Sequence, residues 1–324
     1  MIDLVAERAP LGGLERWLDD PETDEVLVNG GGEIWVDRCG HLSLVGHIRT
    51  STLLAVIEHL LAPTGRRVDR SQPVVDARLA DGSRLCAALE PVAVDGPCLA
   101  IRRLTRRRFE LADFAAPPVV RVLQQLLDHR ANIVVSGATS SGKTSLLGSL
   151  LAATSRDARI VTMEDVAELP IVHPHVVRLE TRPATPDGVG EIELSDLLRA
   201  ALRLRPDRLV LGEIRGTEAI HLLHALNTGH DGSMSTIHAN SAADAVTRLC
   251  TLVVQSAANW PLAAVHEHVA RSIDVIVHVE RGTDGRRSIR EVVELDRRSR
   301  TDGVVSRHLI AEGVVCAELT RGRR

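Results

Sequence analysis

The chain has very little lysine and few aromatic residues. Only one of its 39 lysines and arginines is a lysine, Lys143, and aromatic residues make up 2% of the 324 residues, with no tyrosine. Proteins that bind single-stranded nucleic acid commonly stack bases on aromatic rings, and two Phe and three Trp cannot supply a repeated platform. The formal net charge of −4 gives no overall attraction to nucleic acid either. We therefore expect no direct contact with nucleic acid.

Cysteine pairs and long apolar runs are also missing. The five cysteines form no CxxC pair, which argues against a zinc site, and their odd number suits a reducing compartment. The stretch MIDLVAERAP lacks the apolar core of a signal peptide, and no run approaches the roughly 20 apolar residues that span a bilayer. These absences predict a cytoplasmic protein that reaches the cytoplasmic face of a membrane through a partner.

Two regions of different pattern are joined by a proline-containing stretch. Residues 1–112 mix short strand patterns with an amphipathic helix pattern and predict a small mixed α/β N-terminal domain. Residues 113–118, DFAAPP, are predicted to form a linker, because two prolines stop regular structure. Residues 119–324 alternate apolar strands with helices, which is typical of an α/β domain whose sheet is covered on both faces. A hairpin is expected at 273–296.

The stretch GATSSGKT, residues 137–144, matches GxxxxGK[ST] in full and lies between a strand pattern and a helix pattern. Such a loop curls its backbone N–H groups around phosphate oxygens, and the following helix adds its positive end. A compact ammonium suits this cradle better than a broad, planar guanidinium, which explains why the lone lysine stands here. Thr144 is expected to hold Mg²⁺. The expected nucleotide-binding residues are Gly137, Ala138, Thr139, Ser140, Ser141, Gly142, Lys143, Thr144 and Ser145.

Polar residues follow three other strand patterns. The apolar run RLVLGE ends in Gly212-Glu213, where a carboxylate that coordinates Mg²⁺ or polarises water belongs. The run RIVTME ends in Glu164, which could orient or deprotonate the attacking water. His230 and His238 bracket a Gly-rich turn and a strand, and as a pair they are placed to sense a γ-phosphate.

The phosphate loop alone leaves several protein classes open. A GTPase recognises guanine through an Asn-Lys-x-Asp stretch, and the only lysine already lies in the loop. A small-molecule kinase would need an acceptor pocket and a lid, and neither is identifiable in the sequence.

The four motifs, in this order, resemble the secretion and pilus-assembly ATPases of the type II/type IV secretion superfamily. The segments RLVLGEIRG and TGHDGSMSTIHANS look like the tight-adherence (Flp pilus) branch, and VDARLADGSRLCAALEPV looks like its N-terminal domain. The resemblance covers roughly residues 20–280. It implies a RecA-like ATPase domain, ATP and Mg²⁺ as ligands, a hexameric ring, and an inner-membrane platform protein as partner. The four-cysteine zinc module of some type II secretion ATPases is absent.

The resemblance also implies roles for particular residues. Glu164 would be the general base and Glu213 would act on Mg²⁺ or its water, although these two roles could be exchanged. His230 and His238 would couple the γ-phosphate to domain movement. The N-terminal domain would clamp the nucleotide and bring arginines to the phosphates. The candidate arginines are Arg78, Arg84 and Arg102.

The sequence therefore predicts an ATP-hydrolysing ring motor for pilus assembly or protein secretion. Three alternatives stay open: a conjugative DNA-transfer ATPase, a regulatory ATP-binding scaffold that hydrolyses little, and a monomeric phosphotransferase. The presence of both glutamates and both histidines argues against the scaffold, because a pure switch could lose them.

Overall fold

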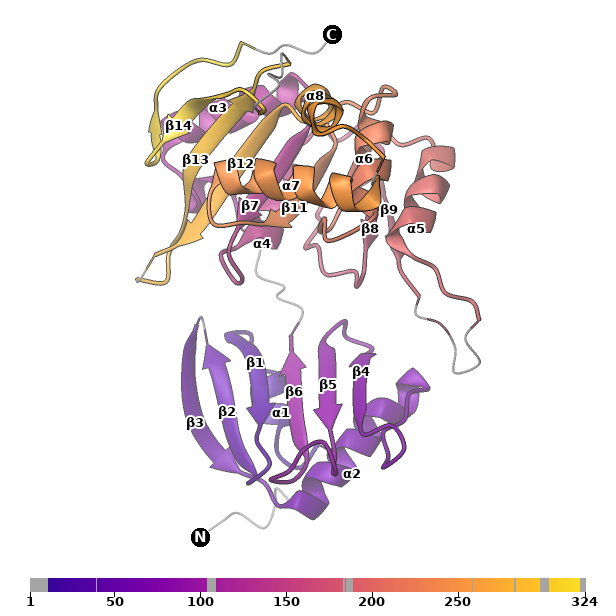
Figure 1. Cartoon of the computed structure of the whole chain (residues 1–324). Helices are drawn as coiled ribbons and strands as arrows, with labels where there is room; N and C mark the ends of the chain where they lie inside the picture. Colours follow the sequence, from indigo (N-terminus) through magenta and orange to yellow (C-terminus); the bar gives the residue numbers. More distant parts are fainter. Residues whose placement is uncertain are drawn as a thin grey trace. The chain divides into compact units, whose positions relative to one another are not determined.

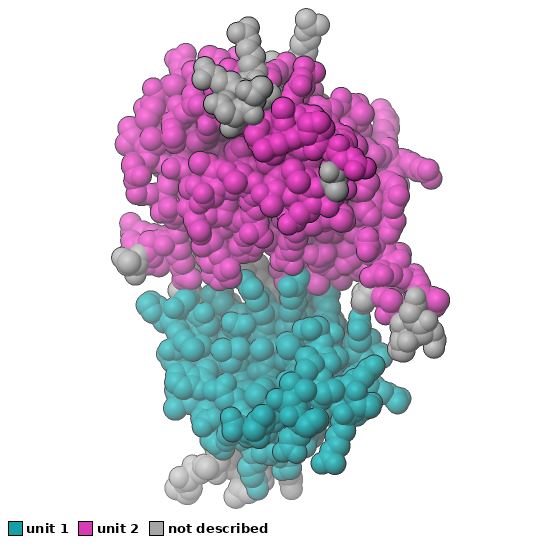
Figure 2. All heavy atoms as spheres, in the orientation of Figure 1, with its two compact units in different colours: residues 1–106 teal, residues 107–324 magenta. Residues whose placement is uncertain are grey.

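The computed structural model describes residues 11–38, 40–103, 109–182, 184, 189–257, 259–282, 284–297 and 303–320. The chain forms two compact units, residues 1–106 and 107–324 (Figure 2). The predicted linker at 113–118 lies within the second unit, where the Phe114 ring is 2% exposed. Pro117 begins a helix instead of ending regular structure, because proline at a first helical position gives up no hydrogen bond.

The first unit is a six-stranded antiparallel sheet with helices packed on one face (Figure 1). The strand order is β3-β2-β1-β6-β5-β4. Alternate strand residues such as Val26 and Ile101 pack against α2 residues such as Val56, because successive side chains in a strand point to opposite faces. The elements are α1 (Glu15–Leu18), β1 (Thr23–Val28), β2 (Glu33–Arg38), β3 (His41–His47), α2 (Thr50–Leu61), η2 (Ala62–Thr64), β4 (Val74–Arg78), β5 (Arg84–Ala88) and β6 (Cys98–Arg102).

The second unit is a nine-stranded mixed sheet in the order β15-β14-β13-β12-β7-β11-β10-β8-β9. Strands β12, β7, β11, β10, β8 and β9 run parallel, and β13 to β15 extend the sheet antiparallel. Its strands are β7 (Ile133–Gly137), β8 (Ile160–Glu164), β9 (Val176–Glu180), β10 (Arg208–Leu211), β11 (Met234–His238), β12 (Val275–Arg281), β13 (Arg287–Leu295), β14 (Ser306–Ala311) and β15 (Val314–Val315). The hairpin expected at 273–296 is confirmed by the antiparallel β12–β13 pair.

Helices cover both faces of this sheet, as the alternating pattern predicted (Figure 1). The side chains of α3 and α4 share one apolar core with the sheet, and those of α5 to α8 share the other. Central parallel strands are buried along their whole length, which is why they read as continuous apolar runs. The helices are η3 (Leu111–Asp113), α3 (Pro117–Asp128), α4 (Lys143–Ala152), α5 (Leu194–Ala201), η4 (Leu202–Leu204), α6 (Glu218–Leu226), α7 (Ala242–Ser256) and α8 (Leu262–Ser272).

Among the residues that the structure describes, no helix is both long enough and apolar enough to cross a bilayer.

Candidate active site

The predicted phosphate loop connects the carboxyl end of β7 to the start of α4. Its residues 138–140 are exposed, so their backbone N–H groups are open to a ligand. Two glycines are sterically required. A Cβ at Gly137 would lie 2.4 Å from both Ser141 Oγ and Val279 O, and Gly142 has φ +103° with Arg287 Cδ 2.5 Å from its missing Cβ. The loop therefore has the tight, side-chain-free backbone that encloses phosphate oxygens.

Lys143 is held against this loop. Its side chain is buried, and Nζ donates hydrogen bonds to Gly137 O at 3.0 Å and Ala138 O at 2.8 Å. The same Nζ lies 3.2 Å from Nδ1 of His238, the last residue of β11. The ammonium thus contacts the end of β11 as well as the phosphate loop.

His238 links the lysine to a carboxylate. An ammonium only donates hydrogen bonds, so His238 Nδ1 must accept from Lys143, and the ring proton sits on Nε2. Nε2 lies 3.0 Å from Glu213 Oε1, and the Glu213 side chain is 16% exposed. The histidine is therefore a neutral bridge that accepts from Lys143 and donates to Glu213.

The electrostatic surroundings keep this histidine neutral. Partial burial lowers the pKa of His238, and the positive charge of Lys143 lowers it further. Glu213 opposes these effects, while Arg215 and Arg248 reinforce them. A His238 pKa below its usual value leaves Nδ1 free to accept at neutral pH.

The chain of polar contacts continues beyond Glu213. Arg215 Nη2 donates to Glu213 Oε2 at 2.6 Å, and its Nη1 lies 3.5 Å from Asp165 Oδ2. Arg215 and Asp165 were not singled out from the sequence. Arg215 could have been proposed from the sequence, because residues two apart in an extended chain share a face and Arg215 lies two residues after Glu213.

Glu164 has a different environment from Glu213. It is 4% exposed, and its Oε2 accepts hydrogen bonds from the backbone N–H groups of Glu168 and Leu169, both at 2.8 Å. Oε1 makes no hydrogen bond within the described chain and lies 3.8 Å from Arg178 Nη2. Burial is the main cause of a raised Glu164 pKa, and the two N–H donors and Arg178 act against it. The carboxylate anchors the loop that follows β8.

The strand order places the two glutamates at different distances from the phosphate loop. Strands β11, β10 and β8 follow β7 in that order across the sheet. Neighbouring strands are about 4.8 Å apart, so β8 lies roughly 14 Å from β7 and β10 roughly 10 Å. Glu213 follows β10 and is connected to Lys143 through His238, whereas Glu164 ends β8.

His230 and His238 do not lie at the same strand end within this chain, and their joint action on a γ-phosphate stays a prediction. His238 ends β11, but His230 precedes it, and the strand between them rises roughly 13 Å. His230 Nδ1 lies 3.2 Å from Ala225 O at the end of α6. Parallel strands place their amino ends at the edge of the sheet opposite the phosphate loop, so His238 lies at this site and His230 lies at the opposite edge.

Three arginines of the first unit form a row. Cross-strand register pairs Arg78 with Arg84 and Arg84 with Arg102, and Arg102 with Glu25. Each arginine alternates with buried apolar residues, so all three side chains leave the sheet on the face away from α2. The sequence selected these residues, and the structure brings them together within their own unit. Their approach to the phosphate loop stays a prediction.

The described residues contain no cluster of three or more His, Cys, Asp or Glu that could hold a metal ion by themselves. Mg²⁺ usually uses one or two protein ligands together with substrate phosphates and water. Thr144, exposed in the first turn of α4, and Glu213 suit that donor set.

Comparison with known proteins identifies the family. Residues 7–314 match the model of the family described as "Type II/IV secretion system protein". The chain belongs to this family. It is 38% identical over 305 residues to a protein of Mycobacterium tuberculosis provisionally named a conjugal transfer protein, covering 90% of this chain and 86% of the relative. It is 32% identical to the conjugal transfer protein TrbB of Rhizobium radiobacter, covering 86% and 85%.

A solved structure agrees on the fold. The pilus retraction motor PilT, solved with bound ADP, superposes with a TM-score of 0.62 at 22% identity, covering 86% of this chain and 81% of that one. The fold predicted from the sequence, a small mixed α/β domain followed by a RecA-like domain, is therefore confirmed. As a member of the secretion family the chain is a nucleotide-binding ATPase.

Proposed function

We propose that this chain is a Mg²⁺-dependent ring motor that hydrolyses ATP to drive a secretion or pilus-assembly machine at the cytoplasmic face of a membrane. The observation that carries the proposal is the unbroken path from Lys143 through His238 to Glu213. This path connects a group that would meet the γ-phosphate to a carboxylate that would meet the attacking water.

The phosphates of ATP would bind the backbone N–H groups of the loop from Gly137 to Ser145, at the positive end of α4. Lys143 would exchange its hydrogen bonds to the Gly137 and Ala138 carbonyls for stronger, charge-assisted contacts with phosphate oxygens. When bound, Mg²⁺ would neutralise charge developing on the phosphates. Thr144 would hold the ion directly. Glu213 would reach it through water, because both carboxylate oxygens already accept hydrogen bonds.

For hydrolysis, we place Glu213 at the attacking water. It pairs with Arg215, and a carboxylate in this position can orient the water and take its proton. Glu164, the residue that the family resemblance favours as general base, has a raised pKa that suits a base. Its Oε2, however, already accepts hydrogen bonds from two backbone N–H groups, which leaves only Oε1 to meet a water. We therefore assign Glu164 primarily to positioning the loop after β8.

The arginine row supports a clamp by the first unit. Like charges directly opposite one another on neighbouring strands repel, and a bound polyphosphate would relieve that repulsion among Arg78, Arg84 and Arg102. An arginine supplied across a moving interface can accelerate phosphoryl transfer by about 10³–10⁵. This arrangement suits a ring in which each site is completed by more than one unit or subunit.

Two kinds of work fit this motor. The first is assembly of a Flp-type pilus with a polytopic inner-membrane platform protein as partner, and it rests on the motif resemblance described above. Conjugative transfer is favoured by the names of the relatives, two of which are conjugal transfer proteins. The low aromatic content makes direct handling of DNA a poor fit in either case, so the motor would power a channel and leave the DNA to other proteins.

The experiment that tests the function is phosphate release from Mg-ATP per protein molecule across a wide dilution series. Lys143→Ala provides the background. We expect activity per molecule to rise steeply with protein concentration and to vanish in the variant, because the site is completed between subunits. Activity that stays flat on dilution would support the monomeric phosphotransferase. No release above background, with ATP binding intact, would support the scaffold.

A further inference from the structure

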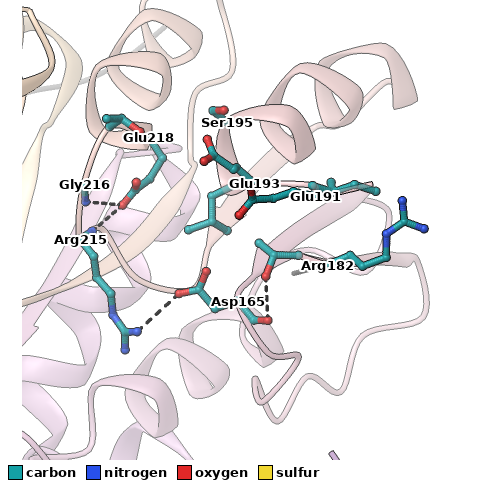
Figure 3. A pocket seen from close by; sticks show the side chains of 12 residues that line it. Asp165, Arg182, Glu191, Glu193, Ser195, Arg215, Gly216 and Glu218 are labelled. Atoms are coloured by element: carbon teal, nitrogen blue, oxygen red, sulfur yellow. Dashed lines mark hydrogen bonds and ion pairs between the residues drawn. The ribbon is translucent and has the colours of Figure 1, made fainter. Parts of the chain in front are cut away.

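A cavity lies beside the active site. It has a volume of about 550 Å³ and opens between the segment after β9 and the turns that begin α5 and α6 (Figure 3). It shares two residues with the polar path described above, Asp165 and Arg215. The remaining lining residues are Thr181, Arg182, Glu191, Ile192, Glu193, Leu194, Ser195, Gly216, Thr217 and Glu218.

The charged groups of this cavity are mostly acidic and only partly used. Four carboxylates and two guanidinium groups line it. Arg215 already contacts Glu213 and Asp165, and Arg182 Nε donates to Gly190 O. In Figure 3 the Arg182 guanidinium points away from the Asp165 carboxylate. The wall is therefore negative on balance.

Two buried polar side chains have atoms that nothing in the described chain engages. Glu218 is 6% exposed, and its Oε1 accepts from Gly216 N at 2.8 Å and also from Arg215 N, whereas its Oε2 makes no hydrogen bond with the residues that the structure describes. Ser195 is 8% exposed, and its hydroxyl likewise makes no hydrogen bond within the part of the chain that the structure describes. Both oxygens reach the open space of the cavity, where they can accept hydrogen bonds from a ligand that carries donors.

We propose that this cavity binds an arginine side chain presented by a partner polypeptide. A guanidinium carries five N–H donors in a planar fork and no acceptor, which complements Glu218 Oε2, Ser195 Oγ and Asp165. An ammonium is a point charge and could not meet separated acceptors equally well. A neutral or anionic ligand would leave the acidic wall uncompensated.

Occupation of the cavity would be transmitted to the catalytic carboxylate. Asp165 shares Arg215 with Glu213, at 3.5 Å and 2.6 Å respectively. An incoming guanidinium at Asp165 competes with Arg215, which then pairs with Glu213 alone. The cavity is thus a position from which a partner could alter hydrolysis without touching the nucleotide.

The test is whether N-acetyl-arginine amide binds the full chain in the absence of nucleotide. Binding is measured by calorimetry and by the NMR chemical shifts of backbone amides at 181–195. N-acetyl-citrulline amide, which is nearly isosteric and neutral, is the ligand control. We expect saturable binding of the arginine compound only, weakened at least fivefold by Ser195→Ala and by Glu191→Gln. Glu267→Gln on α8 makes the same charge change far from the cavity and should leave binding unchanged.

Equal binding of the citrulline compound, or equal affinity in all three variants, would overturn the proposal. Because nucleotide is absent, that failure would leave the ATPase proposal standing. Once binding is established, sedimentation of Glu191→Arg identifies the source of the arginine. If the variant needs a higher protein concentration than wild type to self-associate, the arginine comes from a second copy of this chain. If self-association is unchanged, the arginine comes from a different protein.

Discussion

His238 Nε2 lies 3.0 Å from Glu213 Oε1, although the two residues follow different strands of the sheet. Strand β10 pairs directly with β11, so the carboxyl ends of the two strands place these side chains next to each other. On its other side the imidazole meets Lys143 at 3.2 Å. One ring therefore contacts both the residue expected at the γ-phosphate and the residue expected at the water.

Replacing Lys143 by arginine should abolish nucleotide binding almost as fully as replacing it by alanine. The lysine stem is buried and its ammonium fits between two carbonyls, where a wider guanidinium would clash. We expect ATP affinity to fall roughly hundredfold or more, about 2.7 kcal/mol, as measured with a fluorescent ATP analogue. Arg199→Lys on the exposed face of α5 is the reverse exchange and should change nothing. Tight binding by Lys143→Arg would show that the lone lysine has no steric basis.

The two glutamates should differ in the kind of defect they cause. Glu213→Gln should lower turnover by about 10²–10⁴ while ATP binding persists, because it removes the carboxylate that we place at the attacking water. Glu164→Gln should lower turnover less than tenfold, since its Oε2 contacts serve the following loop. Single-turnover rates and ATP affinity of both variants provide the measurement. The opposite ranking would return the role of general base to Glu164.

The two histidines should also differ. His238→Gln should reduce turnover at least tenfold, because the bridge between Lys143 and Glu213 is broken, whereas His230→Gln should stay close to wild type in single-turnover assays. A strong defect in His230→Gln that appears only at concentrations where subunits associate would place His230 at a subunit contact.

Acid should weaken the fold through His238. Its pKa is lowered in the folded protein, chiefly by burial and then by Lys143, so the unfolded chain binds this proton more readily. The contribution of this residue to stability is therefore complete above the unfolded pKa of about 6.5 and is lost as the pH falls below it. Denaturant midpoints at pH 5.5 and pH 7.5 should differ more for wild type than for His238→Gln. An identical pH dependence in both proteins would contradict the lowered pKa.

Arg208 should be a strong determinant of stability. It is 5% exposed and donates to Gly232 O at 2.9 Å and Leu127 O at 3.0 Å, while burial lowers its pKa to about 10. Arg208→Met should cost about 2–4 kcal/mol, because two buried carbonyls lose charged donors. Arg130 also donates to backbone carbonyls at this edge but is exposed, so Arg130→Met should cost less than about 1 kcal/mol. Urea unfolding of both variants provides the comparison.

Much of the fold could be predicted from the sequence, because it depends on local periodicity. Buried parallel strands give continuous apolar runs, and the phosphate loop has a fixed spacing between its glycines and Lys143. The carboxylates and His238 could be proposed because each follows such a run. The two compact units could be anticipated, although the sequence boundary was placed a few residues too late, since Phe114 looked like part of a linker and is a core residue.

What the sequence could not supply is the order of strands and the competition for hydrogen bonds. Strands β10 and β11 lie between β8 and β7, so Glu164 is far from the phosphate loop. The sequence around Glu164 gives no indication of this strand order. The occupation of Glu164 Oε2 by two backbone N–H groups is likewise a property of the folded loop. The structure also explains the glycine before Glu213. A Cβ at Gly212 would lie 2.9 Å from Glu164 Cγ, so a side chain is excluded there.

Because Lys143 is the only lysine, its state can be followed by chemical modification of amines. Amine-directed reagents such as acyl esters can modify only the α-amino group and this one ε-amino group, because the chain contains no second lysine. The ε-amino group is tethered to two carbonyls and a histidine, so it reacts only when it leaves them. Intact-mass counting of one adduct or two would therefore show whether this ammonium leaves its partners, with no label introduced into the protein.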